Sequence, residues 1–342
     1  MVDRRIRDRL DNPFDVIQPG EHWSTTSFTA YELQRIDFPP VRFAVDTVLA
    51  QGATLLAGKP KTYKSWLALE CAVAVATGGR ACGAWDAPMG DVLAFFAEDN
   101  PRRLKSRLRY YFDQEDWPDN LAIRTEVPRL GAGLREALHD WVSVNEHPAL
   151  VIIDTFNFVR PLRDKTSGYQ TDYADSGVLA QLANELDISL LAIHHQRKMD
   201  ADDPLDSVSG TTGISGGFDS VLALTRSNSG GFELHGRGRD LPEINLAMDF
   251  DADVCRWKLL GDVDDVKKSE TRQAILSALR DGDMGPSEIA EATGLGASNV
   301  KMTLARMLKD GEIAKQGRGV WGLVTSVTCD LQSHKDTQVT GI

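Results

Sequence analysis

Hydrophobic residues in the central part of the chain occur in short runs that longer mixed stretches separate. Runs that suit buried strands lie at 54–57, 92–97, 150–153, 190–194 and 221–224. Strands that alternate with helical stretches are typical of a parallel α/β sheet. After residue 230 the pattern becomes antiparallel, with strands predicted at 231–236, 244–250 and 254–260. The sequence therefore predicts an α/β core with a mainly parallel sheet.

The last part of the chain has a helical pattern. Helices are predicted at 271–279, 287–292 and 299–309, with a Gly-containing turn at 293–296 before the third. A hairpin is predicted at 313–315 and 320–323. Helix, helix, turn, helix and hairpin in this order predict a winged helix-turn-helix domain.

These patterns divide the chain into four parts. Residues 1–40 are polar, contain Pro breakers and are expected to form an N-terminal arm. The α/β core covers 41–262, and a charged linker at 261–268 leads into a winged helix-turn-helix domain assigned to 263–325. The polar tail, 326–342, is predicted to be disordered.

The chain has 342 residues, of which 42% are hydrophobic and 26% charged, and its net charge is −12. These values predict a soluble globular protein. No apolar stretch approaches the roughly 20 residues of a membrane span, and the charged N-terminus lacks the apolar segment of a secretory signal.

The four scattered cysteines indicate reduced thiols in a cytoplasmic protein. The acidic balance is compatible with DNA binding, because a small module can concentrate basic residues locally.

A glycine-containing loop lies between the first strand and an alanine-rich helix at 66–76. Its residues are Gly58, Lys59, Pro60, Lys61, Thr62, Tyr63, Lys64 and Ser65. The layout is that of a P-loop, in which backbone N–H groups wrap the phosphates of a nucleotide. Lys64 is then expected to reach the terminal phosphates of ATP, and the Ser65 hydroxyl to bind Mg²⁺. The alternative is a Gly-Pro turn that only joins a strand to a helix.

Tyr63 occupies the position where the P-loop pattern has its second glycine. Glycine suits that position because the chain turns sharply and passes close to phosphate. A left-handed conformation is expected to cost Tyr63 about 1 kcal/mol or more. We therefore expect either weak nucleotide affinity or a different path of the loop.

Acidic residues follow two of the predicted strands. Because the carboxyl ends of parallel strands face the ligand, Glu98 is a candidate general base that polarises an attacking water. The alternative for this segment is a helix start, with Asn100 as the N-cap before Pro101. Asp154 follows an apolar strand as in a Walker B segment, and is expected to orient Mg²⁺.

Histidines and basic loops follow the remaining strands. His195 is a candidate sensor of the γ-phosphate, and the alternative is a histidine pair that satisfies backbone groups. Long loops at 157–173 and 196–217 carry basic residues that are expected either to contact a phosphate backbone or to remain solvated. These residues are Arg160, Arg163, Lys165, Arg197 and Lys198.

Arg237 and Arg239 lie two residues apart on a predicted strand, so their side chains point the same way. Such an arginine can act on the γ-phosphate of a neighbouring subunit. The alternative is a pair of surface salt bridges.

The third helix and the wing of the C-terminal domain carry a positive side. The basic residues are Lys301, Arg306, Lys309, Lys315 and Arg318. This helix is a candidate for entering the major groove of duplex DNA, and the alternative is a module that binds a replication protein or another partner.

Over roughly residues 40–260, these motifs resemble the RepA-like family of RecA-fold ATPases from plasmids and phages, which is related to hexameric replicative helicases. The resemblance rests on 58–65, 98–100, 153–155, 194–198 and 237–240. It implies that Lys64 and Ser65 bind ATP with Mg²⁺ and that Glu98 is the catalytic base. It further implies a Walker B role for Asp154, a sensor role for His195 and a role of Arg239, with Arg237, in a neighbour's site. The family forms rings around single-stranded DNA.

The sequence therefore suggests an ATP-driven DNA motor, most simply a replicative helicase of a phage or plasmid. A second hypothesis is a DNA-binding regulator or replication-initiation factor in which ATP only switches assembly. A third is an accessory recombination ATPase that loads other proteins without separating strands.

Overall fold

The computed structural model describes residues 29–112, 116–162, 169–195, 205, 213–227 and 230–324. The chain divides after Gly261 into two compact units, 1–261 and 262–342. Most of the predicted N-terminal arm and the predicted tail lie outside the described residues, although the arm includes a short helix, α2 (Ala30–Leu33).

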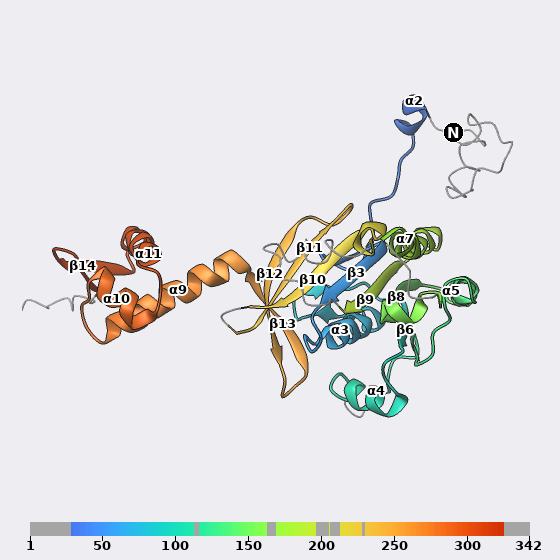
Figure 1. Cartoon of the computed structure of the whole chain (residues 1–342), viewed down its shortest axis with the longest axis horizontal. Helices are drawn as coiled ribbons and strands as arrows, with labels where there is room; N and C mark the ends of the chain where they lie inside the picture. Colours follow the sequence, from blue (N-terminus) through green and yellow to red (C-terminus); the bar gives the residue numbers. More distant parts are fainter. Residues whose placement is uncertain are drawn as a thin grey trace, which may run out of the picture. The chain divides into compact units, whose positions relative to one another are not determined.

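A nine-stranded sheet forms the centre of the larger unit, in the order β13-β12-β11-β10-β3-β9-β8-β6-β7 (Figure 1). The six parallel strands are β3 (Gly52–Gly58), β6 (Asp91–Phe96), β7 (Leu121–Arg124), β8 (Pro148–Asp154), β9 (Ser189–His195) and β10 (Ser220–Arg226). The sheet continues through β11 (Phe232–Gly238), β12 (Ile244–Asp251) and β13 (Arg256–Asp262). The β10–β11 and β11–β12 pairs are antiparallel. The predicted mainly parallel α/β fold is confirmed.

Helices cover both faces of the sheet because its central strands are apolar on both sides. Along β3, Leu56 packs in one hydrophobic cluster, whereas Leu55 packs in the other. The first cluster includes α3 (Lys64–Thr77) and α4 (Pro101–Leu108), and the second includes α5 (Leu134–Val144), α6 (Phe156–Val159) and α7 (Tyr169–Glu185). Smaller elements are β1 (Phe43–Val45), β2 (Leu49–Ala50), β4 (Arg80–Ala81), β5 (Trp85–Asp86) and η2 (Ser215–Gly217).

The register of the parallel strands brings their carboxyl ends to one edge. Gly58 at the end of β3 pairs with His195, and Asp154 pairs with both Ile193 and Phe96. Residues that directly follow these strands are therefore neighbours in space, although they are far apart in the sequence.

The smaller unit contains three helices and a hairpin. Its elements are α9 (Val263–Arg280), α10 (Pro286–Thr293), α11 (Ala297–Lys309), β14 (Ile313–Gly317) and β15 (Val320–Leu323). Ile275, Ile289, Val300 and Leu304 form a shared core. The predicted winged helix-turn-helix architecture is confirmed.

Helix α9 begins at Val263, eight residues before the predicted start at 271, so the charged segment predicted as a linker is helical. Asp262 explains the early start because its carboxylate accepts hydrogen bonds from the backbone N–H groups of Asp264 and Asp265, at 2.9 and 3.4 Å. Acidic residues in the first turn also interact favourably with the helix dipole.

The Asp262→Ala variant is expected to destabilise the start of α9 by about 1 kcal/mol, because it removes the N-cap. Hydrogen exchange at amides 264–268 should become faster. Asp264→Ala is the matched control, since it removes an exposed first-turn acid but no cap, and should cost only about 0.3 kcal/mol. Equal effects of the two variants would contradict the capping role.

Candidate nucleotide-binding site

The loop from Gly58 to Tyr63 joins β3 to α3 at the carboxyl edge of the sheet. A Cβ atom at Gly58 would lie 2.5 Å from the carbonyl oxygen of Leu224 on β10, so a side chain is excluded there. The first glycine of the predicted P-loop is therefore required by the close packing of two neighbouring strands.

Lys64 begins α3 and turns its side chain into the loop. Its Nζ donates hydrogen bonds to the carbonyl oxygens of Gly58 and Lys59, both at 2.9 Å, and lies 3.4 Å from Thr62 Oγ1. The residue is only 3% exposed. Burial lowers the pKa of Lys64 to about 8, although the nearby Asp154 and Glu98 carboxylates act in the opposite direction. The ammonium group thus lies at the centre of the predicted phosphate cradle.

Tyr63 adopts the left-handed conformation that its position requires, with φ 60° and ψ 25°. The loop therefore follows the turn that a glycine would allow. The Tyr63 ring stacks on Phe250 of β12, with centroids 4.2 Å apart and planes at 18°, and meets the edge of Phe232 at 5.9 Å. Such aromatic pairs contribute about 0.5–1.5 kcal/mol each, which offsets the backbone strain.

Asp154 ends β8 and is 4% exposed. The Ser65 hydroxyl lies close enough to influence its carboxylate, while Asp154 Oδ1 is buried without a partner. Burial raises the pKa of Asp154, and the Ser65 hydroxyl opposes that change. A buried carboxylate oxygen without a partner beside a hydroxyl fits Mg²⁺, which prefers oxygen ligands and retains several waters. The described residues contain no group of three or more His, Cys, Asp or Glu side chains suited to a metal.

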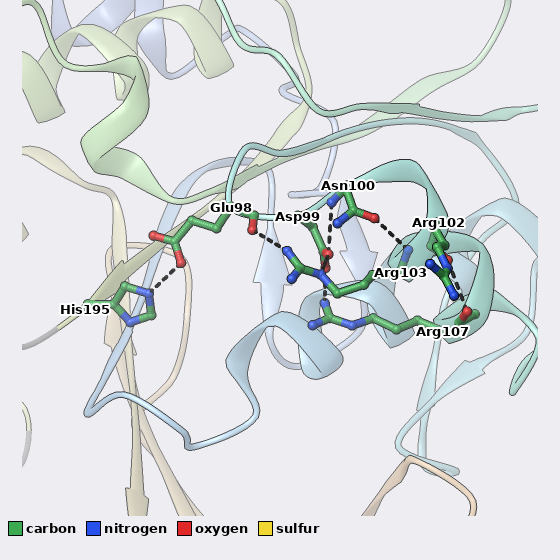
Figure 2. Close-up of polar contacts among 8 residues, drawn as sticks. Glu98, Asp99, Asn100, Arg102, Arg103, Arg107 and His195 are labelled. Atoms are coloured by element: carbon green, nitrogen blue, oxygen red, sulfur yellow. Dashed lines mark hydrogen bonds and ion pairs between the residues drawn. The ribbon is translucent and has the colours of Figure 1, made fainter.

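Glu98 lies just beyond the end of β6 and faces His195 at the end of β9 (Figure 2). Glu98 Oε2 is 3.4 Å from His195 Nε2, and the Thr155 hydroxyl is 3.5 Å from Glu98 Oε1. The Glu98 side chain is 50% exposed, so its carboxylate is accessible to water. The structure thus brings together two predicted site residues that are 97 positions apart.

Asp99 points away from Glu98 and is paired within the domain. Its carboxylate accepts from Arg103 at 2.5 Å and from Arg107 at 2.7 Å, and its side chain is 7% exposed. Asn100 caps α4, since its Oδ1 accepts from the Arg103 backbone N–H at 3.0 Å. The helix start predicted at Asn100 therefore exists alongside a solvent-accessible Glu98.

The two histidines of β9 have different surroundings. Burial lowers the pKa of His194 to about 4, and the neighbouring His195 adds to this effect. His194 is therefore neutral at physiological pH. Of the two histidines, only His195 contacts Glu98.

Arg160, for which the sequence left open a phosphate contact or a solvated position, forms ion pairs within the domain. Its guanidinium pairs with Asp172 and, at 3.3 Å, with Asp175, while its carbonyl accepts from Arg129 at 2.6 Å. These partners follow because α7 begins just beyond the loop and presents two acids on one face. Arg163, Lys165, Arg197 and Lys198 lie outside the described residues.

Arg237 and Arg239 lie toward the other end of the sheet. Val221 of β10 pairs with Arg237 on one side and with Leu55 on the other, so Arg237 is level with the middle of β3, and β10 lies between them. Arg239 follows β11, is 72% exposed and pairs with Asp219 at 3.1 Å. A salt bridge of the kind considered as an alternative is thus present at Arg239.

The positive side predicted for the winged helix is present on α11. Lys301, Arg306 and Lys309 are exposed, whereas Val300 and Leu304 face the core. On the hairpin, the Lys315 ammonium lies 5.2 Å from the centre of the Trp321 ring.

Three cysteines, Cys71, Cys82 and Cys255, are free thiols, and Cys329 lies outside the described residues. Among the helices that the structure describes, none is long and apolar enough to span a membrane.

The strand, loop and helix around Lys64, with Asp154 two strands away on the parallel β8, have the arrangement of a P-loop protein with a mainly parallel α/β fold. The chain matches the AAA domain family over residues 25–201, which is more than half of its length, and it belongs to that family. Residues 269–315 match the family described as bacterial regulatory protein, arsR family.

The solved structures that are similar to the chain include two proteins whose descriptions name an ATPase domain or a helicase. The first is described as the ATPase domain of G40P, with 17% identity, 61% of this chain and 85% of that chain covered, and a TM-score of 0.46. The second is described as the structure of a DnaB-like replicative helicase and its interactions with primase. Its sequence identity is 15%, the match covers 61% of this chain and 57% of that chain, and the TM-score is 0.48. No curated protein matches the chain.

Tyr63→Ala is expected to lower the free energy of unfolding by about 1–2 kcal/mol, because it removes the stack on Phe250 but retains the strained backbone. Tyr63→Phe keeps the stack and should stay within about 0.5 kcal/mol of the wild type. Tyr63→Gly removes both stack and strain, and should be more stable than the alanine variant by about 1 kcal/mol. Denaturant unfolding measures these differences, and equal stability of the Ala and Gly variants would argue against strain at this position.

Nucleotide affinity is expected to fall as the pH rises above about 8. The free Lys64 ammonium begins to lose its proton there, whereas bound phosphates hold the proton to higher pH. Binding then takes up one proton, so Kd for a fluorescent ATP analogue should rise by up to about tenfold per pH unit. Lys64→Arg is the control, since arginine does not titrate in this range. The same pH profile in both proteins would show that another group is responsible.

Proposed function

We propose that the protein is an ATP-hydrolysing DNA motor of the replicative-helicase type, which acts on single-stranded DNA as a ring of identical subunits. The observation that supports this proposal most is the meeting of Lys64, Ser65, Asp154, Glu98 and His195 at one edge of the parallel sheet. Each comes from the end of a different strand or from the P-loop, and together they supply the groups that phosphoryl transfer to water needs.

In this proposal ATP supplies the phosphoanhydride bond and Mg²⁺ neutralises its phosphates. The backbone N–H groups of the loop and of the α3 N-terminus surround the phosphates. Lys64 exchanges its loop carbonyl partners for phosphate oxygens, which also stabilise its charge. Ser65 and Asp154 would hold the metal, which would supply the partner that Asp154 Oδ1 lacks.

Glu98 is the proposed general base because its half-exposed carboxylate accepts a proton from water at the same edge. His195 is the proposed sensor. Its Nε2 contacts Glu98 and not a backbone group, so a phosphate beside it competes directly with the carboxylate for this nitrogen. The contact thus links the presence of the γ-phosphate to the position of the base.

Arg239, with Arg237, is proposed to act on a neighbouring subunit. Arg239 follows Gly238, which is level with Thr54 near the start of β3, whereas the P-loop follows the end of β3. Head-to-tail contacts in a ring bring different surfaces of adjacent subunits together. The Arg239 side chain is 72% exposed, so its guanidinium is accessible to a neighbouring subunit although it pairs with Asp219.

The winged helix is proposed to contact duplex DNA through α11, and the loops after β8 and β9 to contact single-stranded DNA. The match of residues 269–315 to a bacterial regulatory family supports the first assignment. It also favours the second candidate function, a regulator in which ATP switches assembly. That candidate predicts site-specific duplex binding that survives Lys64→Ala. A loader ATPase instead predicts DNA-stimulated hydrolysis without strand separation.

The first test is ATP hydrolysis with and without single-stranded DNA. Lys64→Ala is expected to abolish hydrolysis, and Glu98→Gln to lower kcat by about 10²–10⁴-fold while nucleotide binding persists. Glu136→Gln is the matched control, because it neutralises an exposed carboxylate on α5. A wild-type rate near zero with intact ATP binding would favour the regulator, and unwinding by an assembled oligomer would separate the motor from the loader.

The trans role of Arg239 is tested by mixing two inactive variants. Subunits with Arg239→Ala retain Lys64, and subunits with Lys64→Ala retain Arg239, so a mixed ring contains some complete sites. We expect the mixture to hydrolyse ATP faster than either variant alone. Mixed assemblies without any recovered activity would refute a site shared between subunits.

A further inference from the structure

Helix α4, which directly follows Glu98-Asp99-Asn100, is unusually basic. Residues 101–109 include five arginines or lysines and no acidic residue, although the whole chain has a net charge of −12. In the view of Figure 1, α4 projects from the lower edge of the larger unit. A concentration of positive charge in an acidic protein indicates a local anionic partner.

The basic residues of α4 fall into two groups. Arg103 and Arg107 pair with the buried Asp99, and Leu104 and Leu108 pack in the core on the same side of the helix. The second group is Arg102, Lys105 and Arg109, whose side chains are exposed. Among the described residues, Asp116 lines the same surface hollow as Lys105, so Arg102 and Arg109 are the better candidates for an external anion.

An exposed aromatic ring accompanies this charge. Tyr110 is 48% exposed and meets the edge of the Trp66 ring, with centroids 5.8 Å apart. Arg256 donates to the Tyr110 carbonyl at 3.1 Å and fixes this segment against β13. Positive charge combined with an exposed aromatic ring is the arrangement that binds single-stranded nucleic acids, because the backbone needs cations and an unpaired base can stack. An acidic protein partner would not require the ring.

We propose that Arg102, Arg109 and Tyr110 form a binding surface for single-stranded nucleic acid, and that Arg103 couples this surface to Glu98. This inference rests on the proposed function. It adds a contact on the outer side of α4 to those proposed for the loops after β8 and β9.

Arg103 is suited to the coupling because one guanidinium joins two acceptors. Its Nε donates to Asp99 Oδ1 at 2.5 Å, and its Nη2 donates to the carbonyl oxygen of Glu98 at 2.9 Å (Figure 2). A displacement of α4 therefore moves the backbone that carries the Glu98 carboxylate. Arg103 is a positioning residue in this proposal, since it touches neither nucleotide nor DNA.

The surface is tested with Arg102→Ala/Arg109→Ala in the full chain. Fluorescence anisotropy with labelled oligo(dT) should show a Kd raised by about tenfold, and a salt dependence of log K that is shallower by about 1.4 for two lost phosphate contacts. Tyr110→Ala should raise Kd by about fivefold or more through lost stacking. ATP hydrolysis without DNA should remain at the wild-type rate. Lys258→Ala/Arg280→Ala, which removes two exposed charges outside every proposed site, is the matched control and should leave the Kd for oligo(dT) and its salt dependence unchanged.

The coupling is tested with Arg103→Ala and Arg103→Lys. For both variants, the Kd for oligo(dT) should stay within about twofold of the wild-type value. Oligo(dT) should no longer raise their kcat for ATP hydrolysis, and their KM for ATP should be unchanged. Lysine retains the charge but cannot span both acceptors, so charge alone should not rescue stimulation. Normal stimulation of either variant would overturn the coupling.

Other outcomes separate this inference from the proposed function. If Arg102→Ala/Arg109→Ala leaves the affinity for oligo(dT) and its salt dependence unchanged, α4 is not a binding surface for single-stranded nucleic acid. The same conclusion follows if the only effect of the variant is a raised KM for ATP or a loss of oligomer assembly. If the wild type itself neither hydrolyses ATP nor binds oligo(dT), the proposed function fails. If the wild type does both, failure of the variants refutes only the role of α4.

Discussion

The pairing of β3 with β9 on one side and β10 on the other is the constraint on which the site depends. It buries every residue of β3 and fixes where Gly58 ends the strand. The contact distance to Leu224 then excludes a side chain at Gly58, and the chain must turn into a loop whose carbonyl groups surround Lys64. The same register brings Asp154 and His195 to this edge. Strand pairing therefore determines the backbone geometry of the candidate nucleotide site. The polar side chains of the site extend from this backbone.

Charge compensation determines which polar residues remain available for chemistry. Asp99, Asp172 and Asp175 are buried or nearly so, and each is paired with an arginine. Asp154 is as deeply buried but has an oxygen without a partner, and Glu98 retains an exposed carboxylate. Groups already satisfied within the fold maintain its shape, whereas these two acids are available to a metal and to water.

The sequence predicted those parts that local pattern controls. Apolar runs located the five parallel strands that border or carry the site, and the order of helices and hairpin in the smaller unit was correct. β7 was missed because it is short and only half-buried, and α9 was predicted to start too late because the capping role of Asp262 was not recognised. Contacts between segments that are far apart in the sequence could not be predicted from the local pattern of hydrophobic and polar residues. Nothing near Tyr63 in the sequence indicates Phe250, and nothing near Arg160 distinguishes a DNA contact from an ion pair with α7.

The stack of Tyr63 on Phe250 has a further consequence, because Phe250 belongs to β12, in the part of the sheet beyond the parallel strands. Strands near the border of a sheet open more readily than central ones. When β12 separates, Tyr63 loses the ring that offsets its strain, and the loop relaxes while β3 and α3 remain folded. Conversely, a nucleotide that holds the loop would slow the opening of β12. The conformation of the loop at Tyr63 and the pairing of β12 are thus linked through one aromatic contact.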